Sequence, residues 1–189
     1  MHNLNLKYNV GCIAYSEGIA DDVSKFIWLD QDWSEDITTH KTLRDFASMF
    51  ISPGRADELA CTIAAFEEVY DGPAVSNAAV AQVYRDMKAL EGALNNDGLI
   101  PGFGADGYRF KMPRLMSSFY MYIQRKAQRD SAVFSRALGR IDAGGSADEI
   151  ITLILSDLEE VDISPAPELE NEIWALADEL YERINWKLS

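Results

Sequence analysis

The stretch AVAQVYRDMKALEGAL, residues 79–94, carries the most regular hydrophobic pattern in this chain. Its large apolar residues recur every three or four positions: Val80, Val83, Tyr84, Met87, Leu90 and Leu94. This spacing is typical of an amphipathic α-helix that buries one side. Ser76 or Asn77 stands just before it, and either side chain can cap a helix N-terminus. The stretch therefore predicts a helix that ends near residue 94.

Helical spacing continues on both sides of this segment. The further expected helices are 19–28, 39–50, 53–70, 108–129, 130–141, 146–160 and 168–187. Pro and Gly interrupt the pattern at Asp71-Gly72-Pro73 and at Gly144-Gly145. Ser146 and Glu149 have the spacing of a capping box. Residues 95–107 are expected to form a long loop that is either functional or mobile. The fold class predicted is mainly α, a multi-helix bundle of seven or eight helices.

One short segment departs from the helical pattern. Residues 9–15, NVGCIAY, are apolar and partly β-branched, which favours one short N-terminal β-strand buried on both faces. A lone buried strand would leave its backbone groups unpaired. We therefore expect its partner strands to lie in residues missing from this chain or in another molecule. A strand followed directly by a helix also indicates a β-to-α unit of a parallel sheet.

The segment GCIAYSEGIADDVSKFIW, residues 11–28, resembles the last strand and following helix of a group of bacterial glycoside-hydrolase-like TIM-barrel proteins. The residues that carry the resemblance are Tyr15, Ser16, Glu17, Gly18, Asp21, Asp22 and Lys25. Residues 42–68 and 108–125 resemble the helical region that follows the barrel in the same group, whose members are mostly uncharacterised. The resemblance spans roughly residues 9–130. It implies that residues 1–33 are the last β/α unit of a barrel and residues 34–189 an α-helical C-terminal domain.

The resemblance also implies a function. The chain would be the C-terminal helical region of a carbohydrate-active barrel protein, inactive alone, because such a barrel needs eight strands. Barrel active sites lie at the C-terminal ends of the strands, where Tyr15, Ser16 and Glu17 would sit. Glu17 would be a catalytic or sugar-binding carboxylate; alternatively it caps the following helix. Trp28 and Trp33 would stack on a sugar ring, or they would lie at the edge of the core.

The expected partners of this carbohydrate-active protein are a carbohydrate ligand and the missing barrel, or a partner chain, covering residues 9–15. The alternative is a self-contained helical protein-interaction module without catalysis. The chain has two Cys, no CxxC or HExxH pattern and no phosphate-binding loop. No metal site and no cofactor are therefore expected. No signal peptide and no apolar run of membrane-spanning length is visible, so we expect no membrane partner, and the localisation stays open.

Charge is distributed unevenly along the chain. The formal net charge is −14, from 17 Lys and Arg against 31 Asp and Glu, which argues against nucleic acid as a partner. Residues 107–140 nevertheless contain eight basic residues and one acidic residue, whereas residues 146–189 contain twelve acidic and two basic residues. The basic stretch could bind an acidic partner. Alternatively, it lies against the acidic C-terminal helices of the same chain, in individually weak ion pairs.

Overall fold

The computed structural model describes residues 20–34, 36–98, 100–159, 161 and 163–185. All regular elements in these ranges are helical. The α-helices are α1 Asp21–Trp33, α2 Thr39–Phe50, α3 Ala56–Ala64, α4 Phe66–Val69, α5 Ala78–Asn96, α6 Tyr108–Ala143, α7 Ala147–Glu159 and α8 Pro167–Ile184. Two short 3₁₀ helices, η2 Pro53–Arg55 and η3 Gly104–Asp106, complete the set. Seven of the α-helices have nine or more residues and α4 is a single turn, which confirms the mainly α prediction.

The predicted strand at residues 9–15 lies outside the described residues, so the strand and the 1–33 barrel unit stay predictions. Across the ranges given above, no helix combines the length and the apolar character that crossing a membrane requires.

The corner between α4 and α5 is held by Asn77. Its side-chain oxygen accepts a hydrogen bond from the Ala79 amide (2.8 Å), so Asn77 is the N-cap of α5. Its side-chain nitrogen donates to the carbonyl oxygens of Glu68, Val69 and Asp71. The Asn77 side chain thus bonds to backbone groups on both sides of the turn. These bonds fix the start of α5, the helix with the clearest pattern in the sequence.

The prediction of two helices at 108–129 and 130–141 is wrong, because α6 is one helix of 36 residues. Pro113 lies in its second turn and removes only the amide that would bond to the Arg109 carbonyl. Asp130 does not begin a new helix. Its carboxylate accepts hydrogen bonds from Lys126 (3.1 Å) and Arg129 (2.9 Å) on the same continuous helix.

The hydrophobic core lies among α2, α3, α5, α6 and α8. Its most buried large side chains come from all five helices: Phe46, Leu59, Val83, Met87, Phe110 and Leu180. Helix α1 lies at the edge of this core and has no fully buried residue. Its Phe26 ring contacts the rings of Phe46 and Phe50, with centroids 5.3 and 5.2 Å away. We call this assembly, from α1 to the first half of α6 together with α8, the body.

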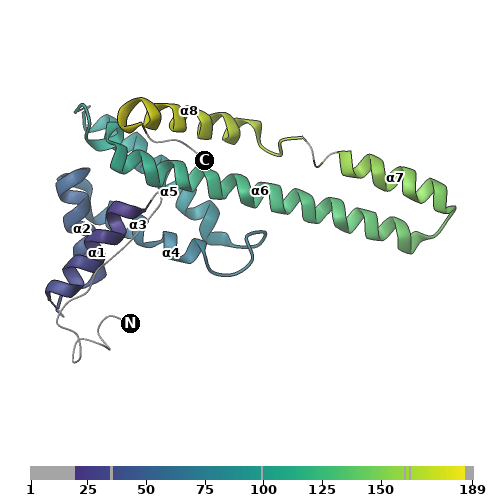
Figure 1. The fold of residues 1–189 in the computed structure, drawn as a ribbon, viewed down its shortest axis with the longest axis horizontal. Coiled ribbons are helices and arrows are strands. Elements are labelled where there is room, and N and C mark those ends of the chain that lie inside the picture. The colour runs from purple at the N-terminus through teal and green to yellow at the C-terminus, as the bar shows by residue number, and fades with distance from the viewer. Residues whose placement is uncertain (1–19, 35, 99, 160, 162, 186–189) are drawn as a thin grey trace.

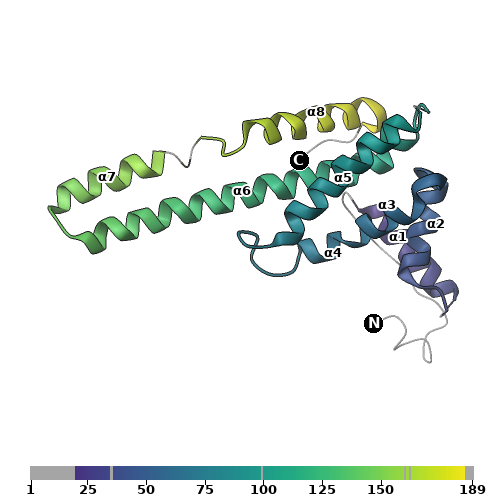
Figure 2. The ribbon, with the colours of Figure 1, turned by 180° about the vertical axis from the view of Figure 1, so that it is seen from behind.

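Helix α6 has 36 residues, which corresponds to a length of about 54 Å. Its first half packs against α5 and α8, and its second half projects away from them with α7 alongside (Figure 1). The view from behind shows the same projection (Figure 2). Gly144 and Gly145 make the turn between the two helices with φ of 72° and 142°, which glycine adopts readily. We call residues 129–143 of α6 together with α7 the arm.

Candidate interaction surface

Among the predicted sugar-binding residues, the structure describes Trp28 and Trp33. Tyr15, Ser16 and Glu17 lie outside the described residues. Trp28 and Trp33 are 46% and 90% exposed on α1. They are five residues apart, which places them about 140° apart around the helix. The two indoles therefore lie on different sides of α1, and their role in sugar binding stays a prediction.

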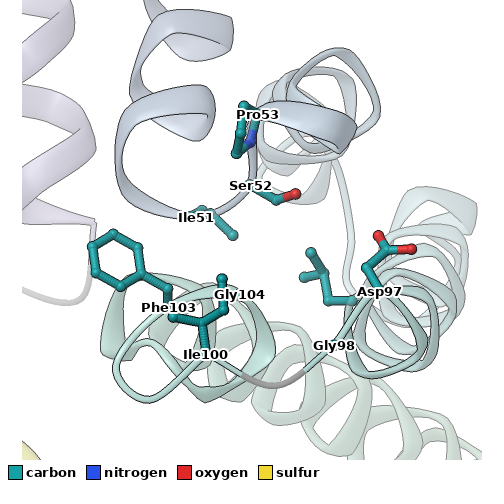
Figure 3. A pocket seen from close by; sticks show the side chains of 9 residues that line it. Ile51, Ser52, Pro53, Asp97, Gly98, Ile100, Phe103 and Gly104 are labelled. Carbon is teal, nitrogen blue, oxygen red and sulfur yellow. The ribbon is translucent and has the colours of Figure 1, made fainter.

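Two hollows lined by described residues are poor candidates for a substrate site. One cavity of about 120 Å³ lies between the end of α2, the start of η2 and the turn after α5 (Figure 3). It is smaller than ordinary ligand pockets, and the carboxylate of Asp97, its charged group, is paired with Arg55 (2.9 Å). A wider, open hollow of about 510 Å³ is lined, among the described residues, by side chains of α7. Within the described ranges, no group of three His, Cys, Asp or Glu side chains could hold a metal ion.

The loop expected at residues 95–107 is tied to the body. Helix α5 extends to Asn96, and the Gly104 amide donates to the Ile51 carbonyl (3.1 Å). Asp106 accepts a hydrogen bond from the Gly102 amide (2.9 Å) and forms an ion pair with Arg183 of α8. Both contacts lower the pKa of the Asp106 carboxyl. The described part of this loop is thus a structural joint between α5, η3 and α8.

A buried charge network joins α5, α6 and α8. Arg114 is 2% exposed, and its guanidinium donates to Glu91 (2.9 Å), Ser118 (2.5 Å) and Glu172 (2.8 Å). Lys88 also reaches Glu172, at 2.9 Å. These contacts confirm that the basic stretch lies against the acidic C-terminal helix of the same chain. Because the charges compensate one another within the body, we interpret the network as structural.

This network makes the stability of the chain sensitive to acid. Burial raises the pKa of the Glu172 carboxyl, but hydrogen bonds from Lys88, Ser118 and Arg114 outweigh it, so the pKa lies below its ordinary value. A carboxyl with a lowered folded-state pKa contributes stability above its unfolded-state pKa and loses it as pH falls through the folded-state value. We expect the urea midpoint to fall between about pH 5 and about pH 3. Glu172→Gln should flatten this dependence, and a midpoint that stays constant down to about pH 3 would contradict the prediction.

The arm exposes an unusual number of large apolar side chains. Six of them are between 47% and 65% exposed: Phe134, Leu138, Ile141, Ile151, Leu155 and Leu158. On each helix the three residues are spaced i, i+4, i+7, so each set forms one stripe. The contact between the helices is made by other residues, among them Val133 and Asp157, which are 2% and 6% exposed. The side chains of the two stripes are therefore distinct from those that pack α6 against α7.

Both stripes lie on the same side of the arm. Around the axis of α6, the centre of the stripe is rotated by about 100° from the buried Val133, in the direction in which residue number increases. On α7 it is centred about 100°, in the same sense, after the direction midway between the half-buried Ile154 and the buried Asp157. Because the two helices are antiparallel, equal rotations from the contact between them point to the same side (Figure 1). The six residues thus form one continuous surface, which we call the apolar face.

The cations of the arm are engaged within the chain. Arg140 forms a two-pronged ion pair with Asp157, at 2.6 and 3.0 Å, and Arg136 approaches the same carboxylate at 3.8 Å. Arg129 donates to Asp130 and to the Val161 carbonyl. By contrast, Asp142, Asp148 and Glu159 are exposed and form no ion pair with any described residue. The free charge on the surface of the arm is therefore negative.

Sequence periodicity alone did not reveal the apolar face. A helix was expected at residues 130–141, and Val133 is the one of its large apolar residues that is buried. The signal that could have revealed it is in α7, where Ile and Leu occupy more than one side of the helix. A helix that is apolar on several sides needs more than one covering surface. No known protein family matches this chain, and no curated protein or solved structure is similar enough to it to indicate a relationship.

Proposed function

We propose that this chain is a helical protein-interaction module and that the apolar face of the arm is its binding surface. The observation that supports this proposal is the exposure of six large apolar side chains on one side of a projecting helical hairpin. Contiguous apolar patches are uncommon on monomeric proteins and mark sites of interaction. Two antiparallel helices with a shared apolar side also correspond to half of a four-helix bundle, which is completed by further helices.

The carbohydrate-active hypothesis stays a prediction from the sequence. Its candidate carboxylate, Glu17, lies outside the described residues, and the exposed Trp28 and Trp33 point to different sides of α1. Hydrolysis of aryl glycosides by this chain, lost on Glu17→Gln, would contradict a module without catalysis.

The interaction function can be tested by site-specific photocrosslinking in the native cells. A benzophenone amino acid at position 138, within the apolar face, should give discrete adducts. The same group at position 153 is the matched control, because Leu153 is 45% exposed on the opposite flank of α7. Excess unlabelled chain should compete for the adducts, whereas excess Leu155→Ser chain should not. Equal adducts from both positions, or none from position 138, would contradict the proposal.

A further inference from the structure

We infer that the partner of the apolar face is a basic amphipathic helix of another protein. This inference rests on the proposed interaction function and adds the chemistry of the partner. The evidence for a basic helix is the acidic border of the apolar face and the dimensions of the face.

The border of the apolar face is acidic. Asp142 lies one turn after Leu138, Asp148 lies one turn before Ile151, and Glu159 lies one turn after Leu155. All three carboxylates are exposed and lack an ion-pair partner among the described residues. A partner with Lys or Arg beside its apolar stripe would neutralise them on binding, which favours both the encounter and the correct orientation.

A second copy of the chain would not supply those cations. Arg136 lies two residues after Phe134, about 200° around α6, and therefore on the opposite flank. Arg140 is held by Asp157 in the contact between α6 and α7. Two copies meeting through this face would bring the same carboxylates together, with a formal charge of −14 on each chain. Like charges at an interface disfavour such a pairing.

The dimensions of the face fit one helix. Helix α7 has 13 residues, which corresponds to a length of about 20 Å. Each stripe spans eight residues, or about 10 Å along its helix, and the two stripes run side by side. A partner helix whose apolar residues at i, i+3 or i+4, and i+7 face the two stripes would match this length.

The test uses the full chain and a fluorescein-labelled peptide of about fourteen residues, made of leucine and lysine with the leucines at helical spacing. Fluorescence anisotropy should show binding in the micromolar range, at least about tenfold tighter than to a scrambled peptide of the same composition. A leucine–glutamate peptide with the same spacing should bind at least about tenfold more weakly than the leucine–lysine peptide.

Matched variants of the chain locate the site. Leu138→Ser with Leu155→Ser should weaken binding at least about tenfold, whereas Leu153→Ser should change it less than about twofold. Asp148→Asn with Glu159→Gln should weaken binding several-fold and reduce its salt dependence, while Glu149→Gln, which lies off the face, should not. Circular dichroism of each variant ensures that only folded chains are compared.

The outcomes separate the two proposals. Equal binding of the scrambled peptide, or equal effects of the Leu153 and Leu155 substitutions, would overturn the basic-helix partner. A concentration-dependent dimer in sedimentation, dissolved by Leu155→Ser, would also overturn it by identifying a second copy as the occupant, and would leave the interaction function standing. A monomer that binds none of the peptides and gives no adduct from position 138 would overturn both.

Discussion

Replacement of Arg114 by methionine is expected to lower the free energy of unfolding by about 3 kcal/mol. Arg114 is buried and bonds to Glu91, Ser118 and Glu172 at once. Methionine fills a similar volume but leaves two carboxylates facing each other without their common cation. The cost lies at the lower end of the range for a broken buried ion pair, because Glu91 and Glu172 are still 27% and 22% exposed.

Urea unfolding of the full chain measures this effect. Arg85→Met is the control, because Arg85 lies on α5 and its side chain bonds only to Gln82 of the same helix among the described residues. We expect it to cost less than about 0.5 kcal/mol. Adding Glu172→Gln to Arg114→Met should recover part of the loss, because it removes one of the two opposed charges. Equal destabilisation by Arg114→Met and Arg85→Met would show that the network contributes little.

Replacement of Phe46 by alanine is expected to cost about 4 kcal/mol and to release α1 from the body. Phe46 is 1% exposed, and its ring packs against Phe26 of α1 and Phe50 of α2. Its removal leaves a cavity where these helices meet. Because α1 has no fully buried residue, the ring contacts of Phe26 are a large part of its attachment. Thermal unfolding should show the loss of stability, and hydrogen exchange should show faster exchange of the α1 amides.

Met49→Ala is the matched control for this substitution. Met49 lies on the same helix but is 65% exposed, so its truncation should change stability by less than about 0.5 kcal/mol. Protection of the α1 amides that is unchanged in Phe46→Ala would contradict the assigned role of the aromatic cluster.

The helices with both a clear stripe and a clear cap were predictable from the sequence. The expected 39–50 helix is α2, and its N-cap is Thr38, whose side-chain oxygen accepts a hydrogen bond from the Lys41 amide. Helix α5 was placed correctly, because Asn77 caps it and Val83 and Met87 recur at helical spacing. In these segments, local hydrogen bonds and burial favour the same boundaries.

The arm was not predictable for a physical reason. Periodicity shows which side of a helix is apolar, but it does not show whether another element covers that side. Val133 and Phe134 are neighbouring apolar residues in the sequence, yet one is 2% and the other 65% exposed. Their difference depends on where α7 lies, and this is set by the turn at Gly144. The continuity of α6 was missed because the predicted helices were divided at Asp130, whereas Asp130 bonds to Lys126 and Arg129 within one continuous helix.

The glycine turn has a consequence for the order of folding. It joins two helices that are adjacent in sequence, so the arm assembles through short-range contacts, whereas the body must bring α8 back onto the start of α6. Contacts between sequence neighbours form faster than distant ones, because less chain entropy is lost in closing the loop. The hairpin can thus form and open as a cooperative unit of its own. The sequence of the arm can therefore change to suit its binding partner without disturbing the hydrophobic core of the body.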